Sequence, residues 1–346
     1  GPLAEKGDLC CGTIDSWLVF KLTQGAEFKT DYSNASRTQL LNLCSLTWDR
    51  EICRIFGIPV SCLPKICDSD AIFGKTRMEG LFDEAIPISC VMGDSHGALF
   101  GQGCLEPGMA KATYGTGSSV MMNVGDAPVF SNQGLAASLA WSRGGKVQYV
   151  LEGNINYTGA VITWLQKQLG LIEHASETEG LALKANPRDR TYIVPAFTGL
   201  GAPYYNSDAT ALITGVTRMT GKPELVKAAL DCIAYQIQDV LVLMDREFGK
   251  GTGRGIAALR VDGGPTRNRY LMQFQSDVLG IPVEVPGDEE LSGIGVAYMA
   301  GIRLGFYDIT DLFGDSGRER YVPRMDQEVR REKILGWKKA VERTVL

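Results

Sequence analysis

The stretch that decides the fold runs from residue 93 to residue 125 and reads GDSHGALFGQGCLEPGMAKATYGTGSSVMMNVG. An apolar run of strand length, residues 86–92 (IPISCVM), leads into it and stops at Gly93-Asp94. A helical turn with Ala98, Leu99 and Phe100 follows. A polar residue between a strand and a helix marks the edge where α/β sheets bind ligands, so Asp94 is a candidate site residue.

Asp94 and His96 also have simpler interpretations. A carboxylate at a helix start is most often an N-cap, and Asp94 taken alone favours that role. His96 has no second histidine or cysteine pair nearby, so a packed or surface histidine is favoured over a metal ligand.

Three glycine-centred turns follow three predicted strands. They are Gly115-Thr116-Gly117, which joins runs 109–114 and 118–124 in a tight hairpin, then Gly153-Asn154 leading to Gly159, and Gly263-Gly264. Glycine has no Cβ, so a backbone N–H can approach a phosphate oxygen there. An ordinary turn explains each pattern better when it is taken alone, and none matches a P-loop or G-x-G-x-x-G.

Strands and helices alternate along the chain, which predicts an α/β fold. The turn-rich residues 103–108 predict a domain boundary. Trp17 and Trp164 lie in apolar runs and are predicted core residues. The predicted strands are 12–22, 37–43 (or a short bend), 86–92, 109–114, 118–124, 147–152, 256–262 and 281–285. The predicted helices are 48–56, about 157–169, 223–248, one that ends at about Leu279, about 290–304 and about 326–343. Asp49 is the predicted cap of the first. Pro223 lies in the first turn of the helix 223–248, and Gly249 follows its end.

Composition limits the function classes. The chain has 346 residues, 45% of them hydrophobic, and a formal net charge of −5. That length favours two domains, and a mildly acidic chain is a poor match for nucleic acid. No apolar run predicts a membrane span, and no signal peptide opens the chain. Nine cysteines without a C-x-x-C pair, and only two histidines, favour free thiols in a reducing cytosol over a zinc site.

Taken together, the segments resemble the FGGY carbohydrate kinases, and within that family the glycerol kinases. The resemblance rests on residues 12–23 (GTIDSWLVFKLT), residues 30–42 (TDYSNASRTQLLN) and the opening stretch. It continues in residues 194–209 (VPAFTGLGAPYYNSDA) and 259–285 (LRVDGGPTRNRYLMQFQSDVLGIPVEV). It covers nearly the whole chain, from residue 7 to residue 345.

The resemblance implies an actin-like ATPase (ribonuclease H-like) fold, with two domains facing a cleft. Residues 1–103 would be the C-terminal part of the first, acceptor-binding domain, and residues 104–346 the second, nucleotide-binding domain. Asp94 corresponds to the catalytic base, near Mg²⁺ but not assigned as a metal ligand. The acceptor-binding residues implied are Asp94, Ser95 and Ser119. The ATP-binding residues implied are Gly115, Thr116, Gly117, Gly159, Ile162, Thr163, Gly263, Gly264, Pro265 and Asn268.

Two departures from the family pattern affect the expected activity. The family begins with a segment that carries an acidic residue and a Gly-Thr-Thr turn, and nothing here matches it. The first domain is therefore expected to be incomplete and the chain alone inactive. Glycerol kinases also carry an aromatic residue where this chain has Ser119, and two glutamines where it has Ser95 and His96. A lost aromatic wall opens space, which indicates a larger or more hydroxylated acceptor.

The leading hypothesis is ATP-dependent phosphorylation of a hydroxyl on a small polyol or sugar, glycerol kinase-like, with Asp94 as general base. One alternative is a kinase for a four- or five-carbon polyol or ketose. Another is a non-catalytic paralogue that binds a nucleotide or sugar. ATP and Mg²⁺ are the expected cofactors and a small polyol or sugar the expected partner, without nucleic acid. We expect a cytoplasmic protein, and the family suggests a homo-oligomer.

Overall fold

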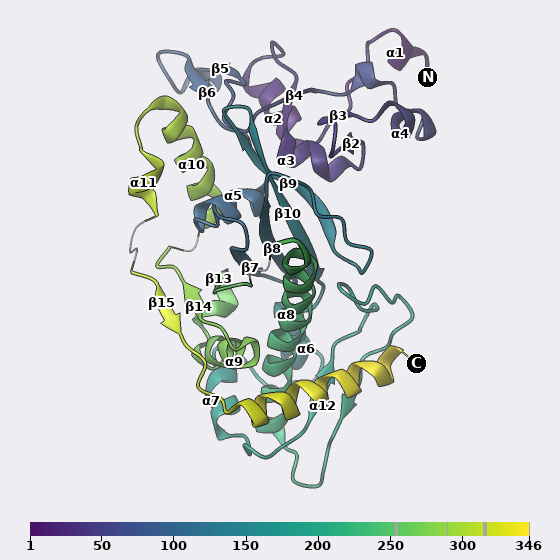
Figure 1. Cartoon of the computed structure of the whole chain (residues 1–346), viewed down its shortest axis with the longest axis vertical. Helices are drawn as coiled ribbons and strands as arrows, with labels where there is room; N and C mark the ends of the chain where they lie inside the picture. The colour runs from purple at the N-terminus through teal and green to yellow at the C-terminus, as the bar shows by residue number, and fades with distance from the viewer. Residues whose placement is uncertain (253–254, 289, 314–316, 346) are drawn as a thin grey trace.

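The structure is a computed structural model that describes residues 1–252, 255–288, 290–313 and 317–345. Figure 1 shows two groups of elements. The N-terminal group contains short helices and strands, and the C-terminal group is a twisted sheet with helices on both sides. In the described part of the chain, no helix is both long enough and apolar enough to cross a membrane.

The N-terminal group contains only short elements. Its strands pair as β1 with β4 in parallel, and as β2 with β3 and β5 with β6 antiparallel. The helices are α1 (Pro2–Glu5), α2 (Ile14–Leu22), α3 (Tyr32–Ala35), η1 (Ser36–Thr38), α4 (Arg50–Ile55), η2 (Val60–Cys62), η3 (Met78–Gly80) and α5 (Asp94–Gly101). The strands are β1 (Lys29–Asp31), β2 (Leu41–Asn42), β3 (Thr47–Trp48), β4 (Lys65–Cys67), β5 (Gly74–Thr76) and β6 (Ile86–Ile88).

A seven-stranded sheet forms the centre of the C-terminal group, in the order β15-β14-β13-β7-β8-β10-β9. β13 runs parallel to β7 and β14, whereas the other neighbours are antiparallel. Its strands are β7 (Ala110–Tyr114), β8 (Ser118–Gly125), β9 (Ala136–Arg143), β10 (Lys146–Ile155), β13 (Leu259–Asp262), β14 (Val283–Val285) and β15 (Glu319–Tyr321). A separate pair is β11 (Tyr192–Val194) with β12 (Leu212–Thr214).

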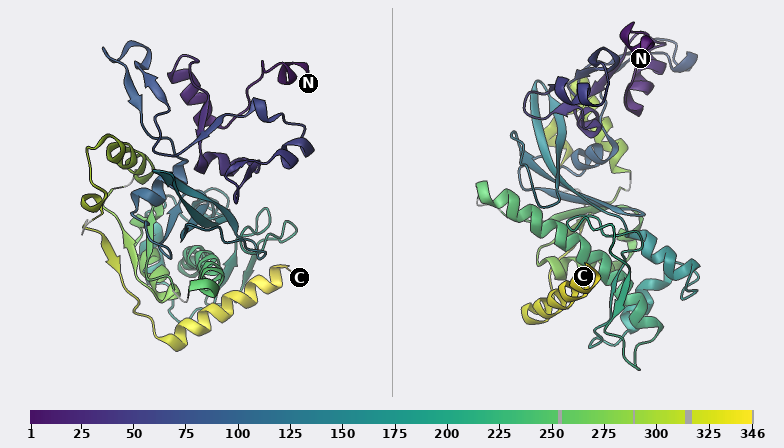
Figure 2. Two further views of the ribbon diagram at one scale, coloured as in Figure 1. Left: turned by 45° about the horizontal axis from the view of Figure 1, so that its top comes forward. Right: turned by 90° about the vertical axis from the view of Figure 1, so that its right-hand side faces the viewer.

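Helices cover the two faces of this sheet. The long helix α8 packs on one face, and α5 with α10 on the other, as Figures 1 and 2 show. Pro223 lies in the first turn of α8, where its missing N–H costs no hydrogen bond. The helices are α6 (Gly159–Lys167), α7 (Glu177–Lys184), α8 (Lys222–Thr252), η4 (Gly264–Arg267), α9 (Arg269–Leu279), α10 (Leu291–Leu304), α11 (Ile309–Leu312) and α12 (Gln327–Val345).

Alternation along β7 separates an apolar face from a polar one. Ala110, Ala112 and Tyr114 join the large core beneath α8 and α9. Lys111 and Thr113 point to the other side, because successive side chains of a strand face opposite ways. The sheet thus carries a polar strip on the face that α5 covers.

Helices α5 and α10 cross with their backbones in close contact. A Cβ on Gly295 would lie 1.9 Å from the carbonyl oxygen of Gly97, and one on Gly101 would lie 2.4 Å from that of Leu291. Only glycine permits such an approach. Gln102, which ends α5, accepts hydrogen bonds at its carbonyl oxygen from Arg260 (2.7 Å) and Arg318 (2.9 Å). The helix that begins at Asp94 is therefore fixed to the C-terminal group.

The prediction of a strand over residues 12–22 is wrong, because this segment forms helix α2. Ser16 and Val19 are buried one turn apart, so the packing follows a helical period in spite of the β-formers. Trp17 is also not a core residue, since 56% of it is exposed. Trp164 is half-buried and lies beside Phe197 at the edge of the core.

Other boundaries differ from those predicted. Gly249 lies inside α8, which continues to Thr252. The predicted strand 37–43 is mostly the 3₁₀ turn η1, and only Leu41–Asn42 pairs as a strand. Strands β9 and β15 and helix α7 were not predicted. The predicted hairpin around Gly115-Thr116-Gly117 and the Asp49-capped helix are confirmed.

Candidate active site

A cavity of about 420 Å³ separates the N-terminal group from the sheet and contains Asp94. It is bounded by α2, the α3–η1 turn, the start of α5 and β10, so both groups contribute to it. Its lining residues are Ile14, Asp15, Leu18, Asn34, Arg37, Met92, Gly93, Asp94, Ser95, His96 and Glu152. Below we call this space the Asp94 cavity.

Asp94 occupies the first turn of α5 and does not cap it. The N-cap position belongs to Gly93, which has no side chain to accept a hydrogen bond from the helix. The hydrogen bond of the Asp94 carboxylate comes from the backbone N–H of Ser95, at 2.6 Å. The side chain is exposed to the cavity. The N-cap interpretation is therefore wrong, and the carboxylate has acceptor capacity left for a ligand.

Arg37 and Glu152 form an ion pair across the Asp94 cavity. Asn154 donates a hydrogen bond to the second oxygen of Glu152 at 3.0 Å. The Glu152 side chain is only 5% exposed, whereas that of Arg37 is 42% exposed. The sequence analysis missed both residues, because a lone arginine and a lone glutamate in unrelated segments give no local signal.

His96 is a packed histidine, as predicted. Both ring nitrogens are buried without a hydrogen-bond partner. Burial, helped by the positive charges of Arg37 and Lys111, lowers the pKa of His96 to about 3. The ring is therefore neutral at neutral pH and makes one wall of the cavity.

The three glycine turns lie next to one another. Gly159 N–H donates to the carbonyl oxygen of Gly115 at 2.9 Å, and Ala160 N–H donates to that of Thr116 at 3.1 Å. A Cβ on Gly159 would lie 2.8 Å from the Gly115 oxygen, and Gly263 has a φ of 96° beside Tyr114. These close approaches need glycine.

A second cavity, of about 510 Å³, lies between α6, α7, α8 and the start of α9. Ile162, Leu230, Ile233 and Leu271 give it apolar walls of the kind that hold a planar ring. Among the predicted residues, those that line it are Gly159, Ile162, Thr163, Gly264, Pro265 and Asn268. Its described lining does not include Gly115, Thr116, Gly117 or Gly263. The Gly115-Thr116-Gly117 turn nevertheless lies next to this cavity, because Gly159 lines it and is hydrogen-bonded to Gly115.

Asn268 has a defined orientation in the second cavity. Its side-chain oxygen caps α9 by accepting from Leu271 N–H at 2.9 Å, and its side-chain nitrogen donates to Thr178 at 3.0 Å. Thr178 belongs to α7, the helix that was not predicted, and Glu179 of the same helix also lines the cavity.

Ser119 lies on the polar strip of the sheet and is not among the described lining residues of the Asp94 cavity. The strand register pairs it with Thr113 on one side and Asn154 on the other. Its hydroxyl oxygen is buried without a partner. Ser95 does line the Asp94 cavity.

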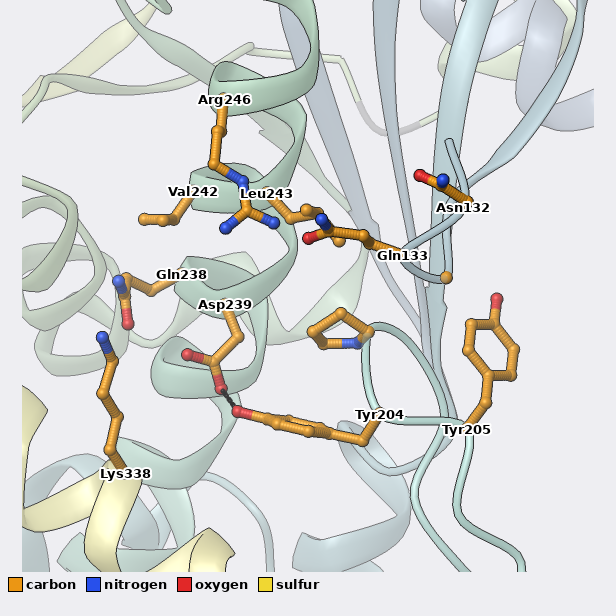
Figure 3. Close-up of a pocket in the computed structure, with 12 residues that line it drawn as sticks. Asn132, Gln133, Tyr204, Tyr205, Gln238, Asp239, Val242, Leu243, Arg246 and Lys338 are labelled. Carbon is orange, nitrogen blue, oxygen red and sulfur yellow. Dashed lines mark hydrogen bonds between the residues drawn. The ribbon is translucent and has the colours of Figure 1, made fainter. Parts of the chain in front are cut away.

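A third cavity, of about 580 Å³, is drawn in Figure 3 and contains none of the predicted site residues. Tyr204 donates a hydrogen bond to Asp239 of α8 at 2.8 Å, and Trp337 of α12 donates to the same oxygen at 2.6 Å. Burial raises the pKa of Asp239 to about 6. These bonds attach the 203–205 loop and the C-terminal helix to α8.

A cavity with an exposed carboxylate, a glycine turn at the end of a strand and an apolar cavity beside that turn are features expected of a two-domain phosphotransferase of the actin-like class. Two family models match: the N-terminal domain of the FGGY family of carbohydrate kinases over residues 3–101, and its C-terminal domain over residues 110–304. The chain belongs to the FGGY family of carbohydrate kinases.

Individual relatives agree with this. A glycerol kinase of Carboxydothermus hydrogenoformans is 48% identical over 342 residues, which are 98% of this chain and 68% of that protein. The crystal structure of Plasmodium falciparum glycerol kinase with ADP matches this chain with a TM-score of 0.92 and 35% sequence identity. The match covers 100% of this chain and 69% of that chain. A xylulose kinase of Lactobacillus acidophilus, at 21% identity and a TM-score of 0.80, shares the fold. The predicted actin-like fold and the assignment to ATP-dependent carbohydrate kinases are confirmed.

Proposed function

We propose that this protein phosphorylates glycerol with ATP, and that Asp94 takes the proton of the attacking hydroxyl. The observation that carries the proposal is the open carboxylate of Asp94, in a cavity that shares Glu152 with the sheet. The same sheet carries the glycine turn that borders the apolar cavity. The high identity to a glycerol kinase over nearly the whole chain supports glycerol as the acceptor.

Each group then has a defined task. The adenosine occupies the second cavity, with Asn268 and Gly264 beside it and Ile162 against the base. The phosphates extend along the Gly115-Thr116-Gly117 turn, where backbone N–H groups and the Thr116 hydroxyl offer donors. The acceptor binds in the Asp94 cavity, and Asp94 accepts its proton as the new P–O bond forms.

Mg²⁺ would be held mainly by the nucleotide phosphates, since the described residues contain no cluster of three or more metal-ligating side chains. This ion prefers oxygen ligands and keeps several waters, and the exposed carboxylate of Asp94 has unused acceptor capacity. Bound there with the nucleotide, Mg²⁺ would neutralise phosphate charge. Asp94 is the residue on this chain that we propose to lie nearest to it.

A kinetic panel on the full-length protein tests the proposal. ATP-dependent phosphorylation is measured with glycerol, tetritols, pentitols and ketoses at saturating Mg²⁺. We expect turnover, with glycerol the acceptor of highest kcat/KM. Absence of turnover with every acceptor would refute the kinase assignment for this protein and favour the non-catalytic paralogue.

A four- or five-carbon polyol or ketose is the second candidate acceptor, and Ser119 is the observation that favours it. A hydroxyl buried without a partner can accept a hydrogen bond from an additional substrate hydroxyl, and serine leaves more room than an aromatic ring. In the same panel, a tetritol or pentitol that exceeds glycerol in kcat/KM would select this candidate.

A further inference from the structure

Lys111 is a buried lysine that the proposed mechanism does not use. It lies on β7 four residues before Gly115, and its side chain is fully buried. Its ammonium donates a hydrogen bond to the hydroxyl of Thr113 at 2.9 Å. Because Thr113 is closer to the turn, the charge leans along the strand toward Gly115-Thr116-Gly117.

The strand register locates Lys111 on the polar strip. Its cross-strand neighbours are Arg260 on β13 and Met121 on β8, and Met121 in turn pairs with Glu152 on β10. Residues directly opposite one another in neighbouring strands share a face. Lys111 therefore lies between Glu152 of the Asp94 cavity and Asp262, which precedes Gly263-Gly264.

Charged groups from several elements surround Lys111. Burial lowers the pKa of Lys111, whereas the negative charges of Asp262, Glu152 and Asp94 raise it. The nearby Cys104 thiol is neutral at neutral pH, because burial raises its pKa to about 11. Arg37 is paired with Glu152, and Arg260 is bonded to Gln102. His96 is neutral at neutral pH.

We propose that Lys111 is a positioning residue whose buried charge holds the terminal phosphate of ATP between the Asp94 cavity and the glycine turn. The proposal rests on the proposed function. The phosphoryl group must lie where the acceptor site and the nucleotide site meet. Lys111 lies on the strand that ends in the glycine turn, two strands away from Glu152 of the Asp94 cavity. Thr113 is about 7 Å from the turn, two residues of strand rise. A buried charge acts strongly over that range, because the protein screens it less than water does.

A lysine that only balances Asp262 and Glu152 would behave differently. Its loss would disturb folding, and it would affect all nucleosides and nucleotides alike. A charge that holds the terminal phosphate discriminates between ligands according to their phosphate number. This difference gives a readout that does not require turnover.

The test compares Lys111→Met with wild type in the full-length protein, with ATP, ADP and adenosine as ligands in calorimetric titrations. We expect ATP affinity to fall about tenfold, ADP affinity to fall less and adenosine affinity to change less than about twofold. Lys333→Met is the matched control, since Lys333 is a partly buried lysine on α12, over the ring of Phe274. It should leave the ratio of ATP to adenosine affinity unchanged.

Thr113→Val is the second variant, and it carries the test if Lys111→Met does not fold. It keeps the charge and removes the hydroxyl that orients it, so we expect a smaller loss with the same dependence on phosphate number. Equal weakening of all three ligands, or none, overturns the role of Lys111. Wild type that binds no ATP would instead refute the proposed function.

Discussion

At the scale of single residues, Asp94 differs from an ordinary helix-start carboxylate because Gly93 holds the cap position. Asp94→Asn keeps the size of the side chain and removes its basicity. We expect kcat to fall by about 10²- to 10⁴-fold, because the base contributes that much, with ATP affinity nearly unchanged. Asp83→Asn, at an exposed position before β6, serves as the control and should keep wild-type kcat. Near-normal turnover of Asp94→Asn would show that Asp94 is not the base.

Ser119 is the residue that tests the second candidate acceptor class, because its buried hydroxyl has no partner. In Ser119→Phe, an aromatic ring fills space on the polar strip, so we expect kcat/KM for glycerol relative to a tetritol to rise about tenfold. Ser119→Ala removes only the unpartnered hydroxyl and should lower kcat/KM for the longer acceptors selectively. If both variants keep the wild-type ratio, Ser119 does not contact the acceptor.

His96 predicts how stability depends on pH. The unfolded chain binds a proton at His96 below pH 6.5, whereas the folded chain binds it only below about pH 3. Between these values the unfolded state holds more protons, so the free energy of unfolding falls as the pH falls, by about 1.4 kcal/mol per pH unit from this group. Denaturant unfolding from pH 7 to 4 measures this slope.

The free energy of unfolding of His96→Met should depend on pH less steeply than that of wild type, by that amount. His174→Met, at an exposed position, should keep the wild-type slope. Equal slopes for wild type and His96→Met would mean that the ring takes up a proton without leaving its site.

At the scale of elements, the crossing of α5 and α10 gives a matched pair of glycines on one helix. A Cβ at Gly295 would lie 1.9 Å from the Gly97 carbonyl oxygen, whereas one at Gly293 meets nothing within 4 Å. Gly295→Ala should lower the free energy of unfolding by about 1–3 kcal/mol through overpacking. It should also lower kcat, because α5 begins at Asp94.

Gly293→Ala should instead raise stability by about 0.5–1 kcal/mol, since alanine restricts the unfolded chain more than glycine does. Urea unfolding and steady-state kinetics of both variants measure the effects. A Gly295→Ala protein as stable as Gly293→Ala would show that the two helices can separate at little cost.

At the scale of the whole molecule, the Arg37–Glu152 ion pair joins the N-terminal group to the sheet. Arg37→Met leaves the buried Glu152 carboxylate with Asn154, so we expect the free energy of unfolding to fall by about 1–3 kcal/mol. The KM for the acceptor should rise. ATP affinity should stay the same, because the cavity that we propose for the nucleotide is built from the C-terminal group.

The exposed pair Arg190–Glu332 provides the comparison, with side chains 75% and 60% exposed. Arg190→Met should change stability by less than about 0.5 kcal/mol, as is usual for surface pairs. The inference about an inter-group contact fails if the two substitutions have equal effects on stability and on acceptor KM.

Four properties of the whole molecule stay predictions. They are the domain boundary between residues 103 and 104, assembly as a homo-oligomer, the absence of a nucleic-acid partner and the cytoplasmic location. Of the fold itself, strands in the centre of the sheet and the helices α8, α9 and α12 were predicted, and α8 followed from the periodicity of its apolar residues. The N-terminal group did not, because its elements are short and take their stability from contacts with distant segments.

Features that depend on local backbone chemistry could be predicted from the sequence. Glycine at positions 117, 159 and 263 is required by close backbone approaches that a Cβ would block, so these turns could be predicted from the sequence. Tertiary structure alone decided the rest. Residues 14–22 are a helix because Ser16 and Val19 pack on one side. Glu152 meets Arg37, and Thr178 meets Asn268, because folding brings together segments 115 and 90 residues apart. Such pairs depend on the whole packing of the chain, and no local pattern encodes them.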